Sequence, residues 1–140
     1  MNNTFKGFYQ VKNRDKCANS MPYFKSSWEL AFMKMCDDHP AILQWSYEPF
    51  KIPYRNPLTH DYTVYVPDFL IVFLDKRHKR QVQLIEIKPS KQTFVEKARS
   101  KVDKASVAVN AAKWEAAAGY ASRNGMTFRI LSENDIYRNP

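Results

Sequence analysis

Two short segments of the sequence combine apolar residues of strand type with charged side chains. The first reads Val-Pro-Asp-Phe-Leu-Ile-Val over residues 66–72, and the second reads Leu-Ile-Glu-Ile-Lys-Pro over residues 84–89. Side chains at positions i and i+2 of a strand point to the same side, so Glu86 and Lys88 are predicted to share one face. If the two strands are neighbours, Asp68 brings a second carboxylate to that face. Two carboxylates and one ammonium group favour a site for a hard cation and a phosphate.

Phosphodiester hydrolysis is the reaction that these groups favour. Mg²⁺ takes a few carboxylate oxygens at roughly 2.0–2.1 Å and keeps waters for a substrate. Asp68, Glu86 and the backbone carbonyl of Ile87 are therefore the predicted ligands, and we expect Mn²⁺ to substitute. The ion would lower the pKa of a water and offset charge on the phosphate. Lys88 is predicted to hold that water or to stabilise the developing negative charge.

Each of these residues also has a structural interpretation. Asp68 fits a strand-end aspartate that faces solvent, although an ionised carboxylate among such apolar neighbours costs about several kcal/mol unless it is paired or metal-bound. Glu86 and Lys88 fit a surface ion pair worth less than about 1 kcal/mol. The three residues together favour the catalytic interpretation.

Composition and charge restrict the class of protein. Lys and Arg number 22 against 14 Asp and Glu, which gives a net charge of +8 and favours a polyanionic partner such as nucleic acid. The 44% apolar content excludes a disordered chain. No apolar run approaches the ~20 residues of a membrane helix, and residues 1–6 lack the apolar stretch of a signal peptide, so we expect a cytosolic protein. Cys17 and Cys36 lack metal-ligand spacing and are expected as reduced thiols.

The apolar pattern predicts the supporting elements in the order helix, three strands, helix, strand. Residues 1–25 are polar and basic without clear periodicity, and we expect an arm that wraps the body or stays mobile. The helical spacing of the next apolar residues predicts a helix that begins at Ser26 or Ser27 and ends near Asp38.

The remaining elements complete a mixed sheet. Strands are predicted at residues 42–54, 62–74, 81–88 and 126–131, the first of them interrupted by two prolines. A helical region is predicted from Thr93 to the C-cap signal Asn124-Gly125, and a break near Asn110 is left open. Short loops favour antiparallel pairing of the first three strands, and the final strand–helix–strand order predicts a right-handed parallel crossover. The fold class is therefore α/β, with one domain over residues 26–140.

Five motifs carry a resemblance to known nucleases. The spacing of Pro67-Asp68 and Glu86-Ile87-Lys88 resembles the PD-(D/E)XK superfamily, and the element order is similar to its restriction-endonuclease-like αβββαβ core. A larger set of motifs resembles the head-completion nucleases of large contractile-tailed phages, a family similar to the TnsA-type endonuclease subunits of transposons. That resemblance runs from residue 23 to about residue 132, through the motifs at residues 24–33, 52–54, 65–69, 85–89 and 112–116.

The resemblance implies more than the residues show by themselves. It implies cleavage or trimming of DNA during capsid maturation, before the tail is attached, with portal or neck proteins as partners. The protein would then act in the host cytoplasm or in the virion. It also implies that Glu29 on the first helix completes the catalytic site as a further metal ligand, whereas alone Glu29 fits a solvated helix charge.

Further basic residues are candidate DNA contacts, and two other functions stay open. The predicted hairpin loop either contacts DNA phosphates or is a solvated tip; its basic residues are Lys76, Arg77, Lys79 and Arg80. Lys91 and Gln92, which follow the active-site strand, are placed to touch a phosphate or a water. One alternative function is a non-catalytic DNA-binding or neck-assembly protein on a nuclease fold. The other is an endonuclease subunit that requires a transposase, for which 140 residues leave little room.

Overall fold

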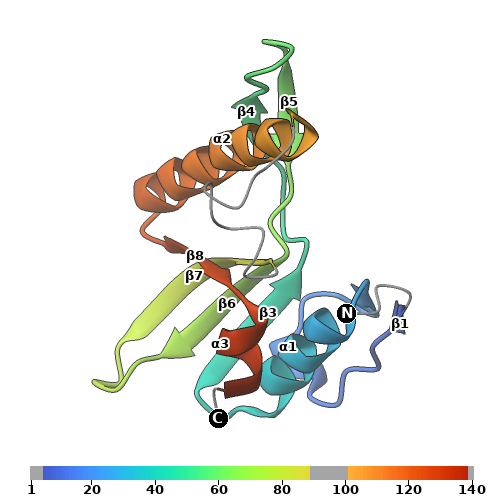
Figure 1. Cartoon of the computed structure of the whole chain (residues 1–140). Coiled ribbons are helices and arrows are strands. Elements are labelled where there is room, and N and C mark those ends of the chain that lie inside the picture. The colour runs from blue at the N-terminus through green and yellow to red at the C-terminus, as the bar shows by residue number, and fades with distance from the viewer. Residues whose placement is uncertain (1–4, 89–100, 139–140) are drawn as a thin grey trace.

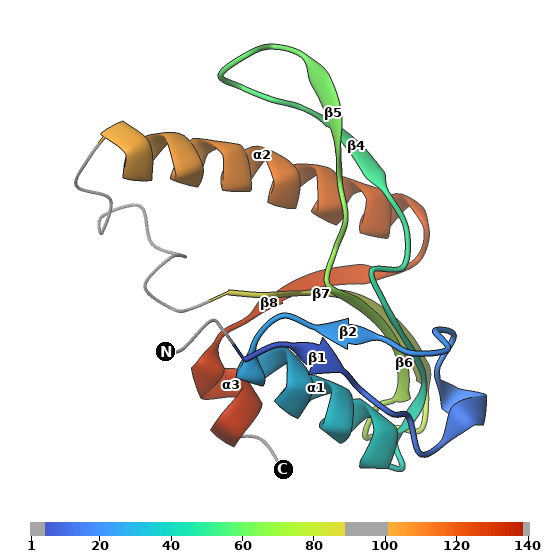
Figure 2. The same ribbon diagram turned by 90° about the vertical axis from the view of Figure 1, so that its right-hand side faces the viewer.

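A mixed sheet with helices on both faces forms the centre of the molecule, as the computed structural model shows for residues 5–88 and 101–138 (Figures 1 and 2). The four strands lie in the order β3 (Ile42–Tyr47), β6 (Phe69–Leu74), β7 (Arg80–Ile87) and β8 (Thr127–Leu131). Helices α1 (Ser27–Asp38) and α3 (Glu133–Arg138) lie on one face, and α2 (Lys101–Arg123) lies on the other. The remaining elements are η1 (Arg14–Lys16) and two ribbons, β1 (Gly7–Phe8) with β2 (Tyr23–Phe24) and β4 (Ile52–Arg55) with β5 (Tyr62–Tyr65).

The pairing of the central strands confirms the predicted α/β class. Strand β6 is antiparallel to both β3 and β7, while β7 and β8 are parallel and are connected through α2. Helix α1 begins where its sequence predicts, because the hydroxyl of Ser26 accepts a hydrogen bond from the Glu29 N–H at 3.1 Å. At the end of α2 the chain turns through Gly125 at φ +70°, and the Met126 N–H donates to the Ala121 carbonyl at 2.8 Å.

The structure corrects two expected strands and answers the question left open about the long helix. The segment predicted over residues 42–54 is two strands, β3 and β4, in different sheets, and Pro53 lies within β4 instead of interrupting it. The strand predicted over residues 62–74 is two strands in different sheets, because the chain leaves the β4–β5 ribbon before Pro67, which has no N–H for a ladder. Helix α2 runs without a break past Asn110. The short helix α3 has no counterpart in the expected elements. The start of the predicted long helix, at Thr93, lies outside the described residues.

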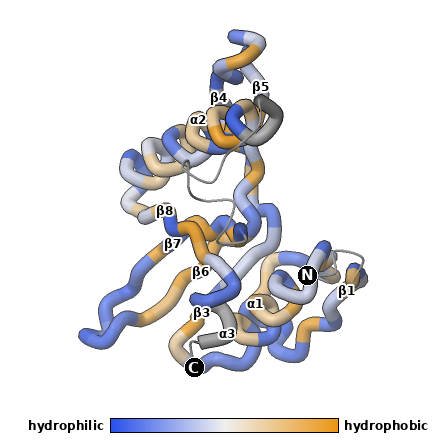
Figure 3. The backbone as a smooth tube through the Cα atoms, in the orientation of Figure 1, coloured by the Kyte–Doolittle hydropathy of each residue, from blue (hydrophilic) through white to orange (hydrophobic). Residues whose placement is uncertain are grey.

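Two hydrophobic cores lie on the two faces of the sheet. The larger one packs Phe32 and Met33 of α1 against Trp45, Phe69 and neighbouring strand residues. The smaller one packs α2 and the β4–β5 ribbon against the other face. The stretches of β6, β7 and β8 that lie together are strongly apolar, and the turn between β6 and β7 is hydrophilic (Figure 3). Within the described ranges, no helix has both the length and the apolar character that crossing a bilayer requires.

The N-terminal segment belongs to the larger core. Tyr9 and Phe24 are buried there, which places the arm around the body. The carboxylate of Asp37, which is 0% exposed, accepts hydrogen bonds from the Tyr9 hydroxyl at 2.6 Å and from the backbone N–H groups of Lys12 and Asn13 at 2.8 and 3.0 Å. One buried side chain at the end of α1 therefore holds the arm in place.

Replacing Asp37 by alanine should lower the free energy of unfolding by about 3 kcal/mol at pH 7, because three buried or partly buried donors lose a charged acceptor. Burial by itself raises the pKa of Asp37, but the hydrogen bonds from Tyr9, Lys12 and Asn13 outweigh it and hold the pKa below its ordinary value. The stabilisation is therefore present above the unfolded pKa of about 3.9 and is lost as the pH falls through the lower folded pKa.

Urea denaturation at pH 7 and near pH 3 tests this stabilisation, with Asp38→Ala as the matched control. Asp38 pairs with Lys12 at 2.6 Å on the exposed surface, so its replacement should leave stability nearly unchanged. Equal losses for the two variants would contradict the role given to Asp37.

Candidate active site

Strand pairing places Asp68 and Glu86 opposite each other. Phe69 pairs with Ile85 at the end of the antiparallel β6–β7 ladder, so Asp68, directly before β6, and Glu86 of β7 are the next two residues when that register is continued by one position. Directly opposed residues of an antiparallel pair point to the same face. Ile85 and Ile87 belong to the core on the α1 face, and Leu84 belongs to the core under α2. The carboxyl group of Glu86 is therefore directed to the α2 face.

Hydrogen bonds and an ion pair fix each of the three predicted residues at the end of β7. The Ile87 N–H donates to Oδ2 of Asp68 at 2.8 Å. Lys88 Nζ lies 3.8 Å from Oε2 of Glu86, and the Lys88 N–H donates to the Leu131 carbonyl at 2.9 Å. Asp68 comes directly before β6 rather than inside a strand, and it is partly exposed, while Glu86 is only 6% exposed. The geometry thus places an aspartate, a glutamate and a lysine at one point of the sheet, as the sequence predicts.

The electrostatics of this site disfavour the simultaneous ionisation of Asp68 and Glu86. Burial raises the pKa of Asp68 well above its ordinary value, and the charge of Glu86 raises it further, against the opposing effect of the Ile87 N–H and of Lys88. Burial also raises the pKa of Glu86, against opposing effects from its hydrogen-bond donor and nearby lysines. Buried carboxylates in close proximity are stabilised in the ionised form by a nearby cation. The pair is therefore suited to a positively charged ligand.

Glu29 comes to the same region from the first turn of α1. It is 9% exposed, and its Oε1 accepts a hydrogen bond from the Lys25 N–H at 2.9 Å, so it is not a solvated helix charge. Burial raises its pKa, and its charge contributes to the raised pKa of both Asp68 and Glu86. Glu29 therefore acts on the pair through its charge, and its own carboxylate accepts the hydrogen bond from the Lys25 N–H just before α1.

The two carboxylates of Asp68 and Glu86 are suitable ligands for a hard divalent cation such as Mg²⁺. Among residues 5–88 and 101–138, no three Asp, Glu, His or Cys side chains lie close enough together to hold a metal ion. Mg²⁺ needs fewer, because it is commonly bound through one or two carboxylates and retains several waters. Asp68 and Glu86 meet that requirement, and the predicted parts of Ile87 and Glu29 as further ligands stay predictions.

The structure brings two further residues to this site that the sequence did not indicate. The Tyr65 hydroxyl donates to Oε1 of Glu86 at 2.5 Å in a buried hydrogen bond, and burial with the nearby carboxylates raises the Tyr65 pKa. Lys113 of α2 lies close enough to lower the pKa of Glu86. The sequence contains a pattern that could have indicated Tyr65, since this residue ends the strand just before Pro67-Asp68. It contains none that singles out Lys113, which is one of many lysines in an alanine-rich helix.

The basic hairpin does not join this site. Lys76, Arg77, Lys79 and Arg80 are exposed at the turn between β6 and β7, and Asp68 is at the other end of β6 (Figure 1). Six strand residues separate them, which corresponds to about 20 Å. Asp75 fixes the turn by accepting hydrogen bonds from the N–H groups of residues 77 and 79. Lys91 and Gln92 lie outside the described residues.

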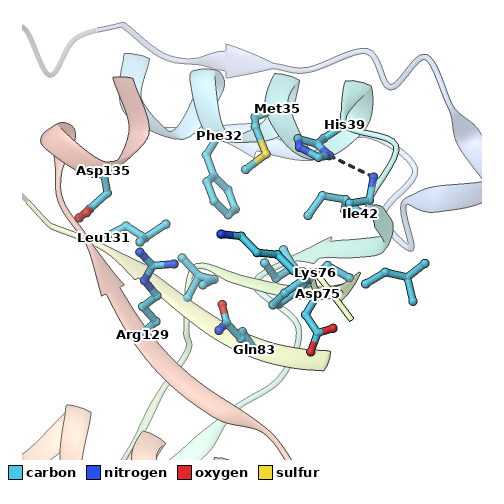
Figure 4. A pocket seen from close by; sticks show the side chains of 15 residues that line it. Phe32, Met35, His39, Ile42, Asp75, Lys76, Gln83, Arg129, Leu131 and Asp135 are labelled. Atoms are coloured by element: carbon cyan, nitrogen blue, oxygen red, sulfur yellow. Dashed lines mark hydrogen bonds between the residues drawn. The ribbon is translucent and has the colours of Figure 1, made fainter. Parts of the chain in front are cut away.

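A separate pocket of about 570 Å³ opens on the α1 face of the sheet (Figure 4). Phe32, Ile42 and Leu131 form part of its apolar lining, and Lys76 and Arg129 extend toward it. Asp68, Glu86 and Lys88 are not among its lining residues. The pocket and the carboxylate pair are therefore different places on the molecule.

Comparisons with known proteins agree with a nuclease. The family model described as "TnsA-like endonuclease N terminal" matches residues 39–133, a range that contains Asp68, Glu86 and Lys88 but not Glu29. The protein named "Head completion nuclease" of Enterobacteria phage T4 is 29% identical over 120 residues, which cover 81% of this chain and 79% of that relative. Because the family model matches more than half of the sequence, the chain belongs to the TnsA-like endonuclease N-terminal family.

Proposed function

We propose that this protein is a metal-dependent endodeoxyribonuclease that hydrolyses phosphodiester bonds of DNA. The observation that carries the proposal is the convergence of Asp68, whose Oδ2 accepts from the Ile87 N–H, and Glu86 at the end of the β6–β7 ladder, with Lys88 Nζ 3.8 Å from Glu86. Asp68, Glu86 and the Ile87 carbonyl would hold Mg²⁺, with Mn²⁺ as a substitute and Glu29 as a further ligand. The bound ion would supply positive charge against the phosphate and a water of lowered pKa.

The chain's own residues supply the rest of the chemistry. Lys88 is partly exposed beside Glu86, where its ammonium group can donate to a phosphate oxygen or hold the attacking water. The hydrogen bond from Tyr65 fixes the orientation of the Glu86 carboxyl group. Lys113 adds a second positive charge from the α2 side of the site. Together these groups bind a phosphodiester and stabilise the negative charge that develops on it.

The proposed biological setting is the completion of phage heads before tail attachment. The T4 relative named for head completion supports this setting, as do the motifs that resemble that family. The partners would be DNA and the portal or neck proteins of a capsid, in the host cytoplasm or the virion. The family match favours one alternative, an endonuclease subunit that acts only with a transposase. A non-catalytic assembly protein is the other alternative.

Cleavage assays with the purified protein separate these functions. Supercoiled, linear and branched DNA are incubated with Mg²⁺, with Mn²⁺ and with EDTA, and the products are resolved on gels. We expect the protein alone to cut with either metal and not in EDTA. Cleavage that persists in EDTA would contradict metal dependence. Binding without cleavage under all metal conditions would contradict the proposal and favour one of the alternatives.

DNA affinity should fall steeply with salt, because Lys and Arg side chains that neutralise phosphates release counterions. Replacing the four basic residues of the β6–β7 turn, Lys76, Arg77, Lys79 and Arg80, by alanine should reduce the salt slope by about 0.9 for each phosphate that the turn neutralises. A variant that exchanges lysine and arginine at the same four positions keeps the charge and is the matched control. The slope is measured by fluorescence anisotropy with duplex DNA. Equal slopes for the two variants would show that the turn is a solvated tip.

A further inference from the structure

The β4–β5 ribbon extends away from the central sheet and is held there by one of its faces (Figures 1 and 2). Ile52, Tyr54 and Tyr65 are buried on the inner face, where they pack in the core that contains Ala117 and Ala121 of α2. The ribbon is therefore attached firmly to α2. The residues of its other face are exposed.

The outer face of the ribbon combines cations with exposed apolar and aromatic groups. Arg55 pairs with Tyr62 across the ribbon and Pro53 pairs with Val64, so these side chains share the outer face. Tyr62 is 79% exposed and Val64 is 49% exposed. Lys51 precedes the ribbon with the same alternation and is also exposed. Two large exposed apolar side chains beside two cations make this face a candidate interaction surface.

The ribbon is connected directly to the carboxylate pair. Tyr65, the last residue of β5, donates to Glu86, and Tyr62 lies three residues earlier on the same strand. Three strand residues span about 10 Å, which matches about three nucleotide steps at roughly 3.4 Å per step of a DNA strand. The loop of the ribbon leans over α2 toward the side on which β7 ends (Figure 2). A nucleic acid that passes the site can therefore reach the ribbon within a few base pairs.

The chemistry of the outer face fits double-stranded DNA. Lys51 and Arg55 complement phosphates, and the segment from residue 51 to residue 65 contains one acidic residue, Asp61. The Arg55 Nε–H donates to the His60 carbonyl at 3.1 Å, which holds the guanidinium group at the outer surface. A two-stranded ribbon has the dimensions that the major groove admits, and several DNA-binding proteins use such ribbons.

We propose that the outer face of the β4–β5 ribbon, through Arg55 and Tyr62, binds duplex DNA beside the bond that is cut. The inference rests on the proposed nuclease function and adds a second binding surface to the catalytic site. Arg55 binds a phosphate, and Tyr62 packs its aromatic ring against a deoxyribose of the backbone. The duplex is then held at two points, the carboxylate site and the ribbon, which fixes its direction across the protein.

Duplex binding by an Arg55→Ala/Tyr62→Ala variant tests the inference. Affinity for a fluorescein-labelled duplex of about two helical turns is measured by anisotropy in EDTA, where cleavage is absent. The double variant should bind about tenfold more weakly than the unchanged protein, and its salt slope should fall by about 0.9 because one phosphate is no longer neutralised. Tyr62→Phe should retain most of the affinity because it keeps the aromatic ring.

A matched control and an assembly measurement make the result decisive. Lys34→Ala/Leu43→Ala removes one exposed cation and one exposed apolar side chain from α1 and β3, and it should bind as the unchanged protein does. Equal affinities of the two double variants would overturn the inference. A dimer in sedimentation that Arg55→Ala/Tyr62→Ala converts to a monomer would also overturn it, since the ribbon would then bind a second copy. Absence of duplex binding by the unchanged protein would instead contradict the proposed function itself.

Discussion

Asp68→Asn should abolish DNA cleavage while the protein remains folded. The substitution removes a proposed ligand of the metal, and its amide oxygen can still accept the hydrogen bond that the Ile87 N–H donates at 2.8 Å. We expect the rate in Mg²⁺ to fall by at least about a thousandfold, which corresponds to about 4 kcal/mol of transition-state stabilisation. Glu86→Gln should have a similar effect, because the opposed carboxylate is removed. Gel assays of plasmid nicking under single-turnover conditions measure both rates.

Thermal melting gives a second measurement that does not depend on activity. Burial and the charge of Glu86 raise the pKa of Asp68 in the folded protein, so the folded state holds its proton more tightly than the unfolded state. The ionised form therefore lowers stability as the pH rises above the unfolded pKa of about 3.9. Without metal, Asp68→Asn should raise Tm at pH 7 and lose that gain near pH 4. Added Mg²⁺ should raise Tm of the unchanged protein but not of the variant.

Asp75→Asn is the matched control, because Asp75 lies at the opposite end of β6 and organises the β6–β7 turn. It should cut DNA at the rate of the unchanged protein. Undiminished cleavage by Asp68→Asn would exclude the proposed site. A Tm of the unchanged protein that does not respond to Mg²⁺ or Mn²⁺ would contradict the proposed ligand pair.

Lys88→Ala should lower the cleavage rate by about a hundredfold to a thousandfold and leave metal binding largely intact. In the proposed mechanism its ammonium group, 3.8 Å from Oε2 of Glu86, stabilises charge that develops on the phosphate, and groups of this kind contribute about that factor. A titration of the rate against Mg²⁺ should give a much lower plateau with a midpoint within a few-fold of the unchanged protein's.

Lys104→Ala, which removes an exposed lysine on α2, is the control and should leave both the plateau and the midpoint unchanged. If Lys88→Ala shifts only the midpoint and reaches the normal plateau, Lys88 supports metal binding and has no direct part in the chemistry. That result would contradict the role assigned to it.

Local elements, and the relation between residues on one strand, were predictable from the sequence alone. Ser26 at the start of α1 and Gly125 after α2 act through their own hydrogen bonds and backbone conformation, so one end of each helix was predictable. The alternation of β7 placed Glu86 and Lys88 on the face opposite to Ile85 and Ile87, because the period of a strand is two whatever its partner is.

The position of Asp68 opposite Glu86 could be predicted only if two conditions about the strands were met. It required β6 and β7 to be neighbours, which the short turn between them favours, and it required the register that the structure has. Pro67 was visible as an irregularity, but the sequence did not indicate that the chain changes sheets there. A missing N–H tells where a ladder is interrupted and not which strand the next segment pairs with.

Which distant residues reach the site depends on the tertiary fold and could not be predicted. Tyr65 and Lys113 come to Glu86 from another sheet and from α2, and the basic turn lies about 20 Å away although it is close in sequence. The N-terminal segment, polar in composition, is held in the core by the buried carboxylate of Asp37. Each of these interactions joins segments far apart in the chain, whereas periodicity and capping describe the chain only over a few neighbouring residues.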